Sequence, residues 1–357
     1  MEQLILAINP GSTSTKVSLF DQGMEVTTQT IRHTTEEISQ FSRIHNQKDF
    51  RKQLILEFLV KQNITVADLL AVVGRGGLLK PIPGGTYLVG ADMLADLKEE
   101  KFGSHASNLG ARLAYEIAQV ADLPAYIVDP VVVDELIPLA RISGLKGIER
   151  RSVAHALNQK AVARKVLAQQ NKAYEESTAI VVHMGGGTSI GAHLNGKMID
   201  IVNGLDGEGP YTPERTGGLP LMDFSEKMVT EKWTLAQAKK IIAGKGGVYS
   251  YLQETDLRKV IEQMQAGDQE ARYVLEGMCY QVAKGIGEMA TVLKGNVDVI
   301  ILTGGVSFAE FIVESIQDSV SWIAPVEVVP GEMEMEALAE GALRVIQGKE
   351  TAKEYTK

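Results

Sequence analysis

The sequence has little cysteine, no long apolar runs and no excess of basic charge. Cys279 is the only cysteine among 357 residues, so no disulfide can form within the chain, and a reducing compartment is favoured. No run approaches the roughly 18–20 apolar residues that a membrane-spanning helix needs. The acidic first residues lead directly into a strand pattern, which is not typical of a signal peptide. We therefore expect a cytoplasmic protein that does not enter a membrane.

The charge balance argues against nucleic-acid binding. The chain has 36 Lys and Arg against 45 Asp and Glu, which gives a net charge of −9. A nucleic-acid surface needs clustered Lys and Arg to neutralise phosphates. A small anion site built from a few placed cations is compatible with this balance. The length of 357 residues is enough for two domains, and 45% hydrophobic residues are typical of a globular protein.

Strand and helix patterns alternate along the chain, which predicts an α/β protein. Strands are expected where short apolar or alternating runs end in turn residues, at 4–8, 16–20, 24–31, 71–74, 125–129, 179–183, 190–194, 198–202, 297–302 and 325–329. Helices are expected where apolar residues recur with helical spacing, at 49–62, 106–120, 152–170, 235–243, 256–265, 269–294, 308–318 and 335–346.

The first three predicted strands have a second copy later in the chain. In both places a strand, a small-residue turn, a strand, a hairpin turn and a third strand follow one another, and residues 10–14 align with residues 185–189. This recurrence indicates internal duplication. We expect one domain over 1–150, completed by the C-terminal helix within 335–357, and a nucleotide-binding domain over 151–334.

Three Gly-rich turns directly follow apolar strands, at 11–15, 185–189 and 303–307. Glycine lets an anion approach the backbone closely, and the N–H groups and hydroxyls of such a turn are donors for phosphate. In α/β sheets, ligands gather at the carboxyl ends of strands. The three turns together predict a phosphate-binding protein.

These segments resemble acetate and butyrate kinases, whose superfamily includes sugar kinases, actin and heat-shock chaperones. The resemblance covers nearly the whole chain, in order, and rests on residues 8–16 (INPGSTSTK), 183–189 (HMGGGTS), 255–258 (TDLR) and 303–306 (TGGV). It implies a duplicated ribonuclease H-like fold of the actin-like ATPase type, with a central cleft between two domains. It also implies ATP/ADP and Mg²⁺ as ligands and a homo-oligomer, a dimer or larger.

Residues 73–87 and 330–341 are similar to the butyrate branch of this family. Two positions also depart from the acetate branch: Gly186 replaces an Asn, and Gln159 stands where a second His would follow His155. The implied reaction is reversible transfer of the ATP γ-phosphoryl group to the carboxylate of a short-chain fatty acid, with a four-carbon acid as the expected substrate. Acetate, propionate and branched acids stay open as alternatives.

A carboxylate nucleophile is already ionised at neutral pH, with a pKa of roughly 4–5, so it needs cations rather than a general base. Arg75 and Arg215 both lie beside glycines, and an Arg fork binds carboxylate or phosphoryl oxygens through two parallel hydrogen bonds. The resemblance makes both of them substrate-side residues. It makes His183, at the end of an apolar strand, the transition-state histidine, and it adds His105 beside the substrate.

The remaining site residues are implied by the same matches. Asp129 completes the catalytic set of Arg75, Asp129, His183 and Arg215. Mg²⁺ takes oxygen ligands, usually only one or two from protein, and we expect Asn9 and Glu334, with Glu332 and Glu336 as rivals of Glu334. The expected nucleotide-binding residues are Gly11, Ser12, Thr13, Ser14, Lys16, Gly185, Gly186, Gly187, Thr188, Asp256, Arg258, Gly304, Gly305 and Val306.

Two other classes of protein fit parts of the pattern. A nucleotide-operated binding protein of the actin or chaperone kind would need no glycine-flanked arginines and would need a client-binding domain, which the sequence does not suggest. A sugar or polyol kinase would use Asp129 as a general base for a hydroxyl group. His33, His45 and His193 are interpreted as ordinary surface or strand residues.

Overall fold

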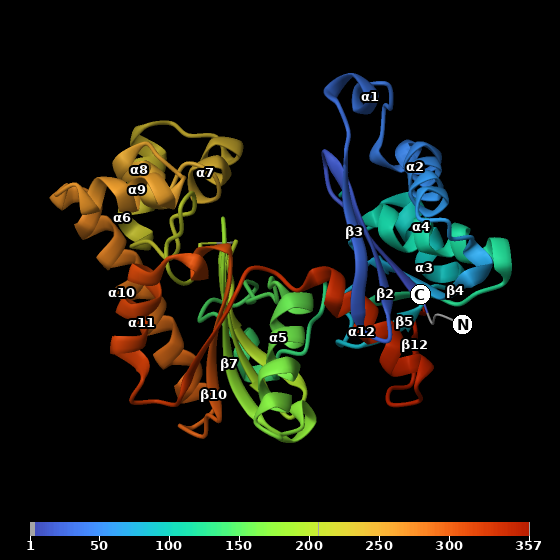
Figure 1. Cartoon of the computed structure of the whole chain (residues 1–357). Coiled ribbons are helices and arrows are strands. Elements are labelled where there is room, and N and C mark those ends of the chain that lie inside the picture. The colour runs from blue at the N-terminus through green and yellow to red at the C-terminus, as the bar shows by residue number, and fades with distance from the viewer. Residues whose placement is uncertain (1–3, 206, 357) are drawn as a thin grey trace. The chain divides into compact units, whose positions relative to one another are not determined.

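The structure is a computed structural model that describes residues 4–205 and 207–356. These residues form two compact units (Figure 1). The first contains the described residues up to Asp134 and those from Met333 onward, and the second is Glu135–Glu332. The sequence analysis put the boundary near residue 150. In the structure, residues 135–150 pack within the second unit, because Ile137 N–H donates to Ile199 O at 3.0 Å and Arg150 pairs with Asp200 at 2.9 Å.

The first unit is built on a seven-stranded sheet with the order β12-β5-β6-β4-β1-β2-β3. β1, β2 and β3 are antiparallel neighbours, whereas β4 lies parallel to both β1 and β6. The strands are β1 (Leu4–Pro10), β2 (Ser14–Asp21), β3 (Met24–Arg32), β4 (Leu69–Arg75), β5 (Thr86–Leu88), β6 (Ala125–Val128) and β12 (Lys353–Glu354).

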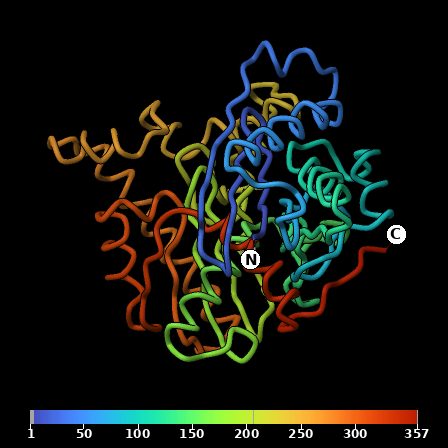
Figure 2. Tube along the Cα trace, turned by 45° about the vertical axis from the view of Figure 1, so that its right-hand side comes forward, coloured from blue at the N-terminus to red at the C-terminus, as the bar shows by residue number. Residues whose placement is uncertain are grey.

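Helices cover both faces of this sheet. Leu4, Leu6 and Ile8 of β1 belong to one apolar cluster with side chains of α2 and α4, while the alternate residues Ile5 and Ala7 are also fully buried. The opposite face is covered by α12, which contacts β1 (Figure 1). β12 pairs with β5 in the sheet that also contains β1, so the first and last described strands belong to one unit. Figure 2 traces the chain from blue at its start to red at its end. The helices are α1 (Thr35–Ser39), α2 (Lys48–Lys61), α3 (Ala91–Glu99), α4 (Asn108–Ala118) and α12 (Glu334–Ile346).

The second unit has a five-stranded sheet with the order β11-β10-β7-β8-β9. α5 lies on one face, and α10 and α11 lie on the other (Figure 1). The strands are β7 (Thr178–Met184), β8 (Thr188–Leu194), β9 (Lys197–Val202), β10 (Val299–Gly304) and β11 (Val326–Pro330). The helices are α5 (Ala156–Gln169), α6 (Leu221–Thr230), α7 (Leu235–Ile242), α8 (Gly247–Leu252), α9 (Leu257–Gln265), α10 (Gln269–Val292) and α11 (Glu310–Val320).

The two sheets share one plan, which confirms the predicted duplication. Three antiparallel strands come first, and two further strands are then added parallel to the first strand of each copy. The carboxyl ends of the parallel strands therefore meet at one edge of each sheet, where bound ligands are expected. Within the described part of the chain, no helix is both long and apolar enough to cross a membrane.

Candidate functional site

Three predicted site residues meet at the strand ends of the first unit. Asn9 lies near the end of β1, Arg75 is the last residue of the neighbouring parallel strand β4, and Glu334 is the first residue of α12. The Asn9 side-chain amide donates to Glu334 Oε2 at 2.7 Å, and the Arg75 guanidinium forms an ion pair with Glu334 Oε1. The Arg75 and Glu334 side chains are 17% and 19% exposed, so solvent screens this pair only partly.

The structure also distinguishes the three glutamates that the sequence offered as candidate metal ligands, Glu332, Glu334 and Glu336. Glu334 is the one that contacts Asn9 and Arg75. Glu332 belongs to the second unit, where Oε1 lies 3.4 Å from His183 Nε2. Glu336 lies further along α12. Among residues 4–205 and 207–356, no three His, Cys, Asp or Glu side chains gather closely enough to hold a metal ion by themselves. An ion that takes one or two protein ligands and completes its shell with phosphate and water fits Asn9 and Glu334 better.

The first Gly-rich turn, which we call the first phosphate turn after its predicted role, connects β1 to β2. Gly11 N–H donates to Ser14 O at 2.8 Å, which closes the turn, and Ser12 and Thr13 are exposed at its tip. Lys16 is exposed on β2, directly opposite Asn9 in the strand register. The predicted nucleotide-binding residues of this turn are therefore accessible.

Behind this turn lies Arg51 of α2, a residue that sequence reasoning missed. Its side chain is fully buried, and the guanidinium donates to the backbone oxygens of Gly11, Ser12 and Ser14 at 2.8, 3.3 and 3.0 Å. It also donates to Thr15 Oγ1 at 3.0 Å and to the side-chain oxygen of Gln47 at 2.7 Å. Burial lowers the pKa of Arg51 to about 10, so the group stays charged at neutral pH. Arg51 lies in a stretch with helical periodicity, and nothing in the sequence distinguishes it there from an Arg on the protein surface.

Asp129 and His105, both predicted as site residues, each make a hydrogen bond to a neighbouring part of the fold. Asp129 follows β6, is only 3% exposed and has a left-handed backbone with φ of 37°. Its Oδ1 accepts the Gly85 N–H at 2.7 Å. His105 Nδ1 lies 2.8 Å from Ser107 Oγ, just before α4. Burial lowers the pKa of His105, and the positive charge of Arg75 lowers it further, so the imidazole is neutral at pH 7.

The second turn, residues 185–187, joins β7 to β8. Gly185 N–H donates to Gly187 O at 2.9 Å. His183, at the end of β7, is only 1% exposed, and Asn158 Nδ2 of α5 lies 2.9 Å from its Nδ1. The ring of His155 stacks on the ring of His183, with centroids 3.8 Å apart and planes inclined by 7°. The pairing of His155 with His183 was not anticipated from the sequence.

Arg215 supports the same turn. Its Nη1 donates to Gly204 O at 2.5 Å. A side chain at position 187 would meet this guanidinium and displace it, so glycine leaves room for Arg215 beside the turn. Arg215 thus lies beside the second turn within the second unit.

A cavity of about 870 Å³ lies in the second unit between the Gly-rich turn, the start of α9 and the segment after β10. Asp256 caps α9 and accepts two side-chain hydrogen bonds from Arg258, at 2.9 and 2.7 Å, which lower the pKa of Asp256 to about 2. Of the predicted nucleotide-binding residues, those that line this cavity are Gly185, Gly186, Asp256, Arg258, Gly305 and Val306.

Gly187, Thr188 and Gly304 do not line the cavity. Gly304 has φ of 90°, and a Cβ there would collide with the backbone of Met184. It therefore permits close packing of β10 against the end of β7 and shapes the turn from behind.

Comparison with known proteins gives one consistent result. Residues 141–328 match the Acetokinase family. The chain is 59% identical over 354 residues to the "Probable butyrate kinase" of Enterococcus faecalis, covering 99% of this chain and 98% of the relative. It is 53% identical over 351 residues to "Butyrate kinase 1" of Clostridium acetobutylicum, covering 98% and 99%.

Solved structures with the same fold are acetate kinases of Porphyromonas gingivalis and Entamoeba histolytica, with TM-scores of 0.78 and 0.74 and 18% and 16% identity. They cover 95% of this chain and 99% and 98% of their own lengths. The predicted actin-like ATPase fold is therefore confirmed. With more than half of its length matched and two full-length relatives above 50% identity, the chain belongs to the acetokinase family.

Proposed function

We propose that this protein phosphorylates the carboxylate of a short-chain fatty acid with ATP, forming an acyl phosphate and ADP in a reversible reaction, and that butyrate is its preferred acid. The observation that carries the proposal is the meeting of Arg75, Asn9 and Glu334 at the strand ends of the first unit. A cation beside oxygen ligands is what an anionic acid and a metal-bound phosphate require. The two full-length relatives named butyrate kinase support the choice of acid.

We assign the cavity of the second unit to the nucleotide. Its apolar side chains, among them Ile261, Val306 and Phe308, suit a purine base. Gly185 and Gly186 line the same cavity and have no side chains, so phosphates can approach the backbone there closely. We assign Ser12, Thr13, Ser14 and Lys16 of the first turn to the terminal phosphates, together with Gly11.

The transfer step needs positioning and charge neutralisation more than proton chemistry. Arg75 is assigned to the acid's carboxylate, where its guanidinium offsets repulsion between the nucleophile and the phosphoryl group. His105, neutral because of burial and of Arg75, is assigned as a hydrogen-bond donor to the same carboxylate. Arg215 and His183, both at the second turn, are assigned to the phosphoryl oxygens in transit.

A magnesium ion would be held by Asn9 and Glu334, with Asp129 beside them at the end of the next strand, β6. When bound, Mg²⁺ neutralises charge on the phosphate oxygens. Glu334 accepts from Asn9 and pairs with Arg75, so these two residues orient its carboxylate. The single cysteine suits the reducing cytoplasm, and we propose a homodimer or larger homo-oligomer on the basis of the family resemblance.

The test is to trap acyl phosphate with hydroxylamine across acetate, propionate, butyrate, isobutyrate and valerate. We expect the highest kcat/KM with four-carbon acids, because each methylene in an apolar pocket changes binding by roughly 1–3 kcal/mol. A tenfold preference for acetate would overturn the choice of butyrate. Absence of acyl phosphate with every acid would overturn the proposed reaction itself.

A further inference from the structure

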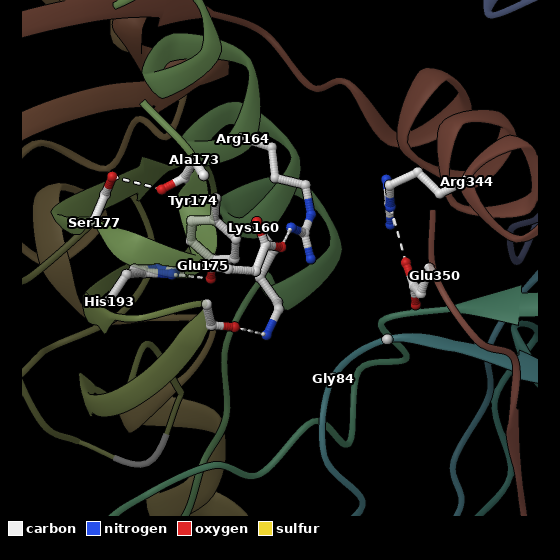
Figure 3. A network of polar contacts seen from close by, with 12 residues as sticks. Gly84, Lys160, Arg164, Ala173, Tyr174, Glu175, Ser177, His193, Arg344 and Glu350 are labelled. Carbon is white, nitrogen blue, oxygen red and sulfur yellow. Dashed lines mark hydrogen bonds and ion pairs between the residues drawn. The ribbon is translucent and has the colours of Figure 1, made fainter. Parts of the chain in front are cut away.

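We infer that two separate chains of buried hydrogen bonds fix both stacked histidines, His155 and His183, in the tautomer that carries its hydrogen on Nε2. Both chains lie in the second unit and link α5 to strands of its sheet, through Asn158 in one chain and Gln159 in the other. Part of the first chain is visible in Figure 3, where Tyr174 and His193 face one another. Gln159 is its central residue, with hydrogen bonds to both Ser189 and His193.

The first chain is oriented by a carbonyl group. Gln159 Nε2 lies 3.2 Å from Ser189 O, and a carbonyl oxygen can only accept, so the amide nitrogen of Gln159 must face it. The amide oxygen therefore faces His193 Nε2, at 3.0 Å, and that ring nitrogen must be the donor. His193 Nδ1 then accepts the Tyr174 hydroxyl at 2.8 Å. Burial, together with the positive charges of Lys160 and Arg164, lowers the pKa of His193 to about 3, in agreement with a neutral ring.

The same chain continues to His155. Gln159 Nε2 also donates to Ser189 Oγ at 2.9 Å, and the backbone N–H of His155 points at this oxygen from 3.4 Å. Because these two donors occupy the lone pairs of Ser189 Oγ, the Ser189 hydroxyl donates its single hydrogen to His155 Nδ1, at 2.9 Å. His155 Nδ1 is an acceptor in this arrangement, and a neutral ring must carry its hydrogen on Nε2.

The second chain reaches His183 by an independent route. Thr303 Oγ1 donates to Gly331 O at 3.1 Å, so its oxygen is an acceptor toward Asn158, whose side-chain nitrogen lies 3.2 Å away. The other amide hydrogen of Asn158 is directed at His183 Nδ1, at 2.9 Å. His183 also carries its hydrogen on Nε2, the nitrogen that lies 3.4 Å from the Glu332 carboxylate.

Burial makes both chains rigid. Gln159, Ser189, Asn158 and Thr303 are each no more than 1% exposed, so water does not compete for their hydrogen bonds. The outcome is a pair of Nε2–H donors on two parallel rings, with centroids 3.8 Å apart, at the second phosphate turn. A role for this pair toward a phosphoryl oxygen rests on the proposed function, whereas the tautomers do not.

The direct test is ¹⁵N NMR of the histidine rings in the full-length protein, because a ring nitrogen that carries hydrogen and one that does not have well-separated chemical shifts. His155→Gln and His183→Gln variants assign the signals. We expect both rings to show a hydrogen on Nε2 and none on Nδ1 at neutral pH. A hydrogen on Nδ1 of either ring would overturn the assignment for that chain.

Ser189→Ala removes the link to His155, and Ser177→Ala is its matched control. Ser177 is similarly buried on the same unit and donates to Ala173 O at 2.6 Å, outside both chains (Figure 3). We expect Ser189→Ala to give a mixture of His155 tautomers, with His183 unchanged, and to lower kcat by about 10- to 100-fold, the usual effect of losing a group that orients a functional histidine. The control should keep wild-type spectra and kcat.

An unchanged His155 spectrum in Ser189→Ala would show that the chain does not set the tautomer. A changed spectrum with unchanged kcat would overturn the positioning role. If the wild-type protein shows a hydrogen on Nε2 of both rings but makes no acyl phosphate, the proposed function is wrong and the tautomer assignment stands. The two failures are therefore distinguishable.

Discussion

Replacing Arg51 by Met tests whether a buried cation holds the first phosphate turn. Met fills much of the same space but donates nothing, so the side-chain oxygen of Gln47, a residue that is 4% exposed, loses its donor, whereas Thr15 Oγ1 keeps His33 Nε2 at 2.9 Å. Such a loss costs ~1–3 kcal/mol. Removing a buried charge that no carboxylate neutralises acts in the opposite direction. We therefore expect the lower half of that range, ~1–2 kcal/mol.

The turn carbonyls of Gly11, Ser12 and Ser14 are more accessible and can bind water once Arg51 is gone. The consequence is a looser turn rather than a large further loss of stability. We expect faster hydrogen exchange over residues 9–17 and a fall in kcat/KM for ATP of about 10- to 100-fold, because displacing a positioned group by about 1 Å is enough for a loss of that size. Arg51→Lys should recover part of both effects, since an ammonium keeps the charge and three donors but not the planar fork.

The assays are urea unfolding, hydrogen exchange by mass spectrometry and steady-state kinetics with ATP. Arg43→Met is the matched control: Arg43 pairs with Glu100 at 2.7 Å, but its side chain is 56% exposed. Such a pair contributes ~0–1 kcal/mol, so the control should differ little from wild type. If Arg51→Met unfolds at the wild-type urea concentration and residues 9–17 exchange at the wild-type rate, Arg51 does not hold the turn and the reasoning is wrong.

Three further predictions concern the proposed site and the buried His193 of the second unit. Arg75→Ala and Arg215→Ala should each lower kcat at least ~10²-fold, the effect of losing one charge-stabilising donor, and wild-type rates would remove these residues from the mechanism. Gly186→Val should abolish ATP binding measured by calorimetry while thermal unfolding stays unchanged, because a Cβ there already lies 3.3 Å from Glu214 Oε1 and a larger side chain enters the cavity. His193 binds a proton in the unfolded chain below pH ~6.5 but in the folded protein only near pH 3, so stability should fall as pH falls through that window, by up to ~1.4 kcal/mol per pH unit. His193→Asn should have a shallower pH dependence of the urea midpoint, and an unchanged slope would contradict the neutral, buried His193.

The elements predicted best were those whose burial leaves a clear pattern in the sequence. β1 and β7 are buried on both faces and appear as continuous apolar runs, and the predicted α2, at 49–62, differs from Lys48–Lys61 by one residue at each end. α6 was missed because none of its residues is buried, so no core selects its pattern. β12 was missed because two residues, Lys353 and Glu354, carry no periodicity.

The candidate site was predictable where glycine or strand ends mark it, and not where support comes from distant helices. Gly185 and Gly305 were found from their turns and line one cavity in the structure. Arg51 and Gln159, by contrast, lie in ordinary helical patterns, and their importance comes from tertiary contacts with turns about 36 and 30 positions away. A single sequence does not record such partners.

The two phosphate turns occupy equivalent positions in a duplicated fold, yet different residues lie behind them. Arg51 gives the first turn a permanent charge, because a pKa of about 10 leaves it protonated throughout the neutral range. Behind the second turn, uncharged amides and hydroxyls orient His155 and His183, and the Arg215 guanidinium lies beside the turn. A fixed cation attracts an anion at long range, whereas uncharged donors discriminate by geometry at contact. The duplication has therefore diverged in the residues behind the turns, and substitution of Arg51 should alter the salt dependence of ATP binding, while substitution of Asn158, Gln159 or Ser189 should not.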